Sequence, residues 1–180
     1  MLWRIRLKTL LLLRHAAVNH FDENIDDHEK ELNKDGEKES SQLANWLEKS
    51  DVKIDKIFSS SAKRALSTAK ILFQNQKNFF EDNLLYLCDC LVILNLIKKQ
   101  SKDVNNLAII GHEPSLSETL KILVGNARPD LNYYRDMVFP TAGLAIINFN
   151  VLAWDKIDER SGTLDAFITT EYLLEQNAKD

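Results

Sequence analysis

Residues 10–16 read LLLLRHA: four leucines, then an arginine, a histidine and an alanine. The apolar run has the length of a strand and is bounded by charge, so it predicts a buried strand over Leu7–Leu13. It is too short for a membrane span or for the core of a signal peptide, and we therefore expect a cytoplasmic protein. Arg14 and His15 then fall just past the carboxyl end of that strand.

Helix and strand signals alternate along the rest of the chain. Helices are expected at Lys34–Lys49, capped by Asn33, at Ala62–Phe73, capped by the serines at 59–61, at Leu87–Lys99, and from Pro114 to just before Gly125. Strands are expected at Val52–Phe58, Leu107–Gly111, Leu144–Phe149 and Leu164–Thr169. This order predicts an α/β three-layer sandwich with a largely parallel central sheet. We expect one domain over residues 1–180, with a core of about 7–170 and frayed ends at 1–6 and over the last eight residues.

The composition excludes some classes of function. Of the 180 residues, 44% are apolar and 28% charged, and the net charge is −4, so we expect no nucleic-acid partner and no membrane partner. Cys88 and Cys90 lie two apart, where their side chains diverge, and a disulfide between them is not expected. The four histidines show no metal-ligand spacing, so neither a metal nor a cofactor is expected.

The candidate site collects residues that follow the carboxyl ends of strands. Arg14 and His15 follow the first strand, His112 follows Leu107–Gly111, and Arg64 falls in the first turn of the helix after Val52–Phe58. Ligands of open α/β sheets bind at this edge, and arginine forks match the oxygens of a phosphate. Each residue alone has an ordinary structural explanation, but the four together predict a dianion site. His20 and His28 lie in an acidic stretch and are interpreted as surface residues.

Five ordered segments resemble the histidine phosphatase superfamily, whose members have a phosphoglycerate mutase-like fold. LLLLRHA resembles the L-x-x-R-H-[GA] signature, and the later blocks are Asp27–Gly36, Ile57–Leu72, Leu107–Leu116 and Phe139–Leu144. The second arginine of the family falls at Arg64 and its second histidine at His112. Together these matches extend over nearly the whole chain.

Within the superfamily, the chain is most similar to the SixA-type phosphohistidine phosphatases. It has R-H-A in place of R-H-G, it is short, and it lacks a large insertion between Arg64 and His112. The chain departs from the family pattern at Lys30-Glu31, where Arg-Pro is frequent, and at Ser61, where proline is usual. The resemblance implies removal of phosphate from phosphohistidine on a signalling or phosphotransfer protein.

The mechanism that we expect is that of a metal-independent hydrolase. His15 is the expected nucleophile, and Arg14, Arg64 and His112 are expected to hold the phosphoryl group. No proton donor aligns with confidence among Glu81, Asp82 and Asp89, although Asp89 is the one to test first. An alkoxide leaving group needs an acid more than a protonated phosphoramidate nitrogen does, which favours phosphohistidine. The alternatives are a phosphatase or mutase of small phosphate esters and, less favoured, an inactive phosphoprotein-binding module.

Overall fold

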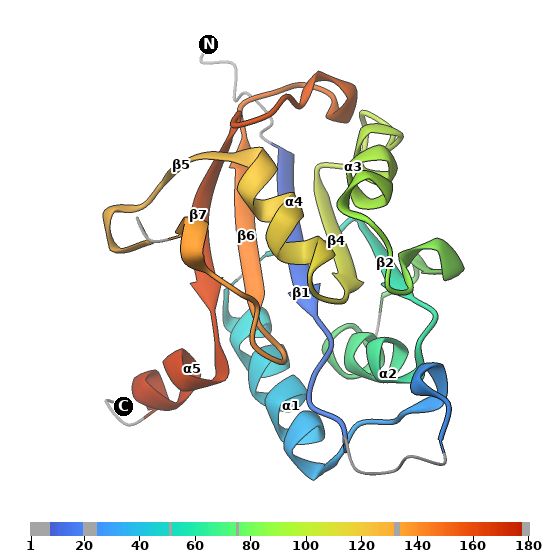
Figure 1. Cartoon of the computed structure of the whole chain (residues 1–180). Coiled ribbons are helices and arrows are strands. Elements are labelled where there is room, and N and C mark those ends of the chain that lie inside the picture. The colour runs from blue at the N-terminus through green and yellow to red at the C-terminus, as the bar shows by residue number, and fades with distance from the viewer. Residues whose placement is uncertain (1–7, 20–24, 51, 75, 132–133, 178–180) are drawn as a thin grey trace.

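The structure is a computed structural model that describes residues 8–19, 25–50, 52–74, 76–131 and 134–177. Seven strands form one sheet in the order β3-β2-β4-β1-β6-β7-β5. The strands are β1 (Lys8–Arg14), β2 (Lys56–Ser60), β3 (Phe79–Asp82), β4 (Asn106–Gly111), β5 (Val124–Ala127), β6 (Leu144–Phe149) and β7 (Gly162–Ile168). The helices are α1 (Lys34–Lys49), α2 (Lys63–Leu72), α3 (Cys90–Lys98), α4 (Ser115–Leu123) and α5 (Thr170–Asn177), with short 3-10 turns between them (Figure 1).

The sheet is parallel on one side of β1 and mixed on the other. β1 pairs in parallel with β4, β4 with β2, and β2 with β3, whereas β6 runs antiparallel to both β1 and β7. The expected α/β sandwich with a largely parallel sheet is therefore confirmed. The parallel register places Arg14 opposite Gly111, so β1 and β4 end at the same edge.

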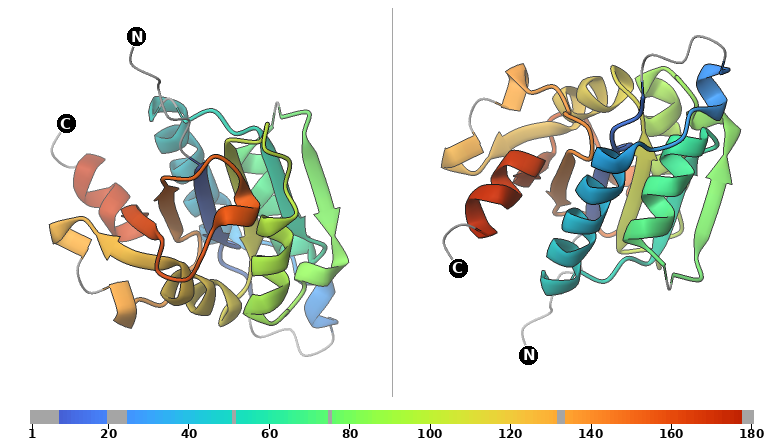
Figure 2. Two further views of the ribbon diagram at one scale, coloured as in Figure 1. Left: turned by 90° about the horizontal axis from the view of Figure 1, so that it is seen from above. Right: turned by 90° about the horizontal axis from the view of Figure 1, so that it is seen from below.

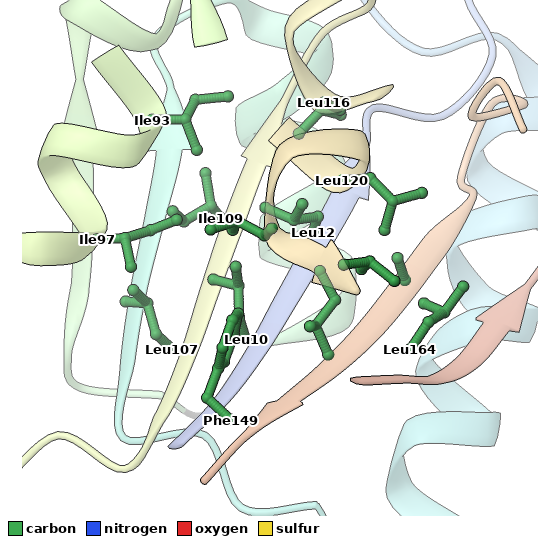
Figure 3. Packing of buried hydrophobic residues seen from close by; sticks show 14 of the residues in the cluster. Leu10, Leu12, Ile93, Ile97, Leu107, Ile109, Leu116, Leu120, Phe149 and Leu164 are labelled. Atoms are coloured by element: carbon green, nitrogen blue, oxygen red, sulfur yellow. The ribbon is translucent and has the colours of Figure 1, made fainter. Parts of the chain in front are cut away.

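The four leucines explain why β1 lies in the middle of the sheet. Leu10 and Leu12 face the side covered by α3 and α4, and Leu11 and Leu13 face the side covered by α1, α2 and α5. All four are at most 1% exposed, and burial of each leucine contributes roughly 1.5–3 kcal/mol. Figure 2 shows the helices on both faces, and Figure 3 shows Leu10 and Leu12 packed among residues of β4 and α4. A strand that is buried on both faces needs a continuous apolar run, as the sequence has here.

Several predicted boundaries shift. The strand expected at Val52–Phe58 is observed at Lys56–Ser60. The residue before it, Asp55, belongs to a loop, because its carboxylate accepts hydrogen bonds from the backbone N–H groups of Asn105 and Asn106. The helix expected at Leu87–Lys99 begins at Cys90, where Asp89 caps it. The helix expected at Ala62–Phe73 spans Lys63–Leu72, and its N-cap, Ala62, makes no side-chain cap bond, so the predicted serine cap is wrong.

Two strands and one helix were not expected from the sequence. β3 and β5 are four-residue edge strands, and Val124 alone among their eight residues is buried. α5 occupies most of the stretch that was expected to fray, and buried Leu173 anchors it within the α1 side of the core. The fraying expected at residues 1–6 lies outside the described residues. In the part of the chain that the structure describes, no helix is long and apolar enough to cross a membrane.

Candidate active site

His15 and His112 meet at the edge of the sheet where β1 and β4 end. The His15 N–H donates to the Gly111 carbonyl at 3.2 Å, which continues the strand pairing by one residue. The two imidazole rings lie 5.1 Å apart between centroids. The structure thus brings together the two histidines that the sequence separates by almost a hundred residues.

The hydrogen bonds of His15 set its tautomer. Nδ1 lies 2.8 Å from the Ala16 carbonyl oxygen, which can only accept, so Nδ1 carries the proton. Nε2 then holds the lone pair and accepts from Nε of Arg64 at 3.2 Å. Burial lowers the pKa of His15 to about 4, and the charges of Arg64 and Arg14 contribute in the same direction. The ring is therefore neutral at pH 7, and its Nε2 carries the lone pair that a nucleophile requires.

Two buried nitrogens beside this ring lack a hydrogen-bond partner among the described residues. Arg14 donates through Nη1 to the Phe139 carbonyl at 2.7 Å, while its Nε has no partner. His112 bonds through Nε2 to the Ser60 hydroxyl at 2.8 Å, while its Nδ1 has no partner. The pKa of His112 is lowered to about 3, mainly by burial and to a smaller extent by the charge of the neighbouring His15. Buried polar atoms of native proteins are nearly always paired, so these two are suited to meet a ligand.

Arg64 reaches the same site from the first turn of α2 and is only 4% exposed. Its Nη1 donates to the main-chain carbonyl of Asp27, and its Nη2 donates to the Asp27 carboxylate at 2.8 Å. Partial burial by itself would raise the pKa of Asp27, but hydrogen bonds from Arg64 and Tyr86 and the charge of Arg64 lower it to about 2. Asp27 is thus a carboxylate at neutral pH.

Tyr86 lies against three of these residues. Its hydroxyl donates to Asp27 at 2.9 Å, its ring meets His112 edge-on at 5.6 Å, and the Arg64 guanidinium carbon lies 5.9 Å from the ring centroid. His28 packs edge-on against Tyr86 at 4.8 Å and bonds to the Ser61 hydroxyl at 2.9 Å. His28, which the sequence placed on the surface, is therefore half-buried in this cluster. His20 lies outside the described residues.

Glu39 ties the loop after β1 to the loop before β6. Its two carboxylate oxygens accept from the Ala17 N–H and the Thr141 hydroxyl, each at 2.9 Å. The Ala142 N–H in turn donates to the His15 carbonyl at 3.2 Å. A Cβ at Gly36 would lie 2.1 Å from the Ala17 carbonyl oxygen, so only glycine lets α1 approach this loop so closely.

In the described part of the chain, the three carboxylates considered as proton donors make no recorded contact with His15, Arg14, Arg64 or His112. Asp89 accepts from the Leu91 N–H at 2.8 Å as the cap of α3, and Asp82 accepts from the Leu84 N–H at 2.9 Å. Glu81 is an exposed residue of edge strand β3. The carboxylate that does contact one of the four residues is Asp27, which pairs with Arg64. No role was predicted for Asp27, even though it begins one of the family segments. Tyr86 was missed because no local pattern marks it.

Within the described ranges, no three His, Cys, Asp or Glu side chains gather in a way that could hold a metal ion. Cys88 and Cys90 are both free thiols, as the spacing predicted.

Comparison with known proteins bears on the family and on the fold. The family model of the histidine phosphatase superfamily (branch 1) matches residues 10–84. An uncharacterized protein of Mycobacterium leprae (strain TN), ML1117, is 29% identical over 159 residues, which cover 86% of this chain and 98% of that protein.

Solved structures share the fold. A protein of Nakamurella multipartitia, assigned as a SixA phosphohistidine phosphatase, has a TM-score of 0.77 at 22% identity, covering 90% of this chain and 95% of that one. A phosphoserine phosphatase of Entamoeba histolytica has a TM-score of 0.63 at 13% identity, covering 92% and 99%. The superfamily match supports hydrolase chemistry of the phosphatase type. These findings show that residues 10–84 are similar to the histidine phosphatase superfamily and that the chain has the fold of the SixA-like structures.

Proposed function

We propose that this protein is a metal-independent phosphatase that forms a covalent phosphohistidine at Nε2 of His15. The observation that carries the proposal is the state of the His15 ring. Its Nδ1–H is bound to the Ala16 carbonyl, its pKa is lowered by burial, and the Nε2 lone pair faces Nε of Arg64. A neutral imidazole with a directed lone pair is an activated nucleophile.

The reaction has two displacements at phosphorus. The Nε2 lone pair attacks in line, the bond from phosphorus to the leaving group breaks, and that group departs with the electron pair. The positive charge left on the phosphorylated ring is stabilised by the Nδ1–H bond to Ala16. Nε of Arg14, Nε of Arg64 and Nδ1–H of His112 donate to the phosphoryl oxygens. Water then attacks phosphorus, His15 is released as a neutral ring, and inorganic phosphate leaves.

The proposed substrate is phosphohistidine on a signalling or phosphotransfer protein. Support comes from the carboxylate at the site, because Asp27, with its pKa of about 2, has no proton to give an alkoxide at neutral pH. A phosphoramidate nitrogen can take its proton from solvent before it leaves, so such a substrate does not need an acid from the protein. The cytoplasmic location expected from the sequence is part of this proposal.

Small phosphate esters are the second candidate substrates. The phosphoserine phosphatase that shares the fold is the reason to consider small esters. Its 13% sequence identity to this chain bears on the fold alone. They require a proton donor that the residues around His15 do not offer in the protonation states described above.

A labelling experiment with a substrate comparison tests the proposal. The wild type should take up phosphate from a histidine-phosphorylated peptide in an acid-labile, alkali-stable form, and His15→Ala should not. Hydrolysis of that peptide should be much faster than hydrolysis of a panel of alkyl phosphates. Label that persists in His15→Ala would refute the nucleophile, and alkyl phosphates hydrolysed as fast as the peptide would refute the substrate class.

A further inference from the structure

The guanidinium of Arg64 is held on its outer side by a single residue. Both Nη atoms donate to Asp27, one to its main-chain carbonyl and one to its carboxylate, so Nε is the donor turned toward His15. Asp27 lies in the 3-10 turn Asp27–Glu29, and Figure 1 shows this blue turn beside the start of α2. An arginine with one fixed orientation loses less freedom when it binds an anion than one that must first be ordered.

Tyr86 holds Asp27 in turn. The Tyr86 hydroxyl and Nη2 of Arg64 donate to the same oxygen, Oδ2 of Asp27, at 2.9 and 2.8 Å. The other carboxylate oxygen lies 3.4 Å from Nζ of Lys30. Asp27 is thus held by donors from three different segments of the chain, although half of its side chain is exposed.

The charge of Asp27 has a second consequence. A carboxylate that pairs with Arg64 offsets part of the positive charge which would otherwise attract a phosphate dianion to the site. Like charges a few ångströms apart repel, and the repulsion is strong where the surroundings are buried. The same residue therefore aids the orientation of Arg64 and weakens the binding of anions, including the phosphate product.

We propose that Asp27 is the positioning residue of Arg64, that Tyr86 holds it in place, and that its charge limits retention of the phosphate product. This inference rests on the proposed function in one respect, since it takes the phosphoryl group to bind beside His15. It predicts opposite effects on two measured quantities when the charge is removed. Loss of a carboxylate that serves only the stability of the fold would not lower turnover while strengthening the binding of phosphate.

Asp27→Asn tests the charge, because the amide oxygen can still accept from Arg64 and Tyr86. We expect a lower kcat on p-nitrophenyl phosphate, because a neutral amide holds Arg64 less firmly than a carboxylate does. We also expect a lower Ki for inorganic phosphate, because the charge that repels the anion is gone. Each change should be about threefold to tenfold, the range of one charge-assisted contact. Tyr86→Phe should shift both quantities in the same directions by less. Asp130→Asn is the matched control, because Asp130 makes an exposed pair with Arg128, and it should change neither quantity. A Ki that rises or stays the same in Asp27→Asn would overturn the proposal.

A double-mutant cycle tests whether Asp27 acts through Arg64. Asp27→Ala should lower kcat/KM in the wild-type background and cause almost no further loss in Arg64→Ala, because residues that act as a unit are not additive. Equal losses in both backgrounds would overturn the positioning role, and thermal melting of each variant identifies any loss of folding. If the wild type neither hydrolyses the aryl phosphate nor becomes labelled, the proposed function fails. In that case the affinity for inorganic phosphate, measured by calorimetry on the wild type and on Asp27→Asn, still tests the inference.

Discussion

Replacement of Arg64 by alanine is the sharpest test of the proposed anion site. In the structure, Nε of Arg64 lies 3.2 Å from the nitrogen that is proposed to attack phosphorus, and the side chain is 4% exposed. A charge-assisted hydrogen bond to a phosphoryl oxygen contributes about 1.5–3 kcal/mol, so its loss should lower kcat/KM by about ten- to a hundredfold. Arg64→Lys should recover little, because an ammonium group cannot hold Asp27 and reach the phosphoryl group together.

Lys63→Ala supplies the matched control. Lys63 precedes Arg64 in the same turn of α2 and carries the same charge, but it pairs with Glu29 at 3.1 Å with its side chain 46% exposed. Steady-state kinetics on p-nitrophenyl phosphate and phosphate inhibition should separate the two variants, with thermal melting as the check on folding. Loss of an exposed ion pair changes little. Our reasoning is refuted if Arg64→Ala stays within about fivefold of wild type, or if Lys63→Ala is equally slow.

Three other predictions follow from the site. Glu81→Gln, Asp82→Asn and Asp89→Asn should each leave phosphohistidine turnover nearly unchanged, and loss of activity in one of them would identify a proton donor. The neutral ring of His15 attacks, and its pKa is lowered to about 4. After correction for ionisation of the substrate, kcat/KM should therefore stay constant below pH 6.5 and fall only near pH 4. A fall centred at pH 6.5 would contradict this. Glu39→Ala leaves the Ala17 N–H and the Thr141 hydroxyl without their acceptor and should cost about 1–3 kcal/mol of stability, measured by denaturant unfolding, with Glu39→Gln intermediate.

Much of the fold was predictable because its signals are local. The apolar run at residues 10–13 defines a strand buried on both faces, and Asn33 marks the start of α1 with a cap that the structure contains. Edge strands β3 and β5 carry no such signal, since pairing with a neighbouring strand stabilises them more than their own sequence does. Helix α5 was missed for a similar reason, because its one buried leucine gains stability only by packing into a core built from distant residues.

The sequence by itself identified the four residues that we propose to carry the chemistry. Arg14, His15, Arg64 and His112 stand where strands end and helices begin, and the carboxyl ends of parallel strands meet at one edge of a sheet. Only the tertiary structure decided how these residues are set for reaction. The pairing of Arg64 with Asp27 joins positions 37 residues apart, and Tyr86 reaches the same carboxylate from 59 residues away. Such contacts depend on the paths of loops between elements, which no periodic pattern records, and they fix the orientation of Arg64 and place a carboxylate beside it.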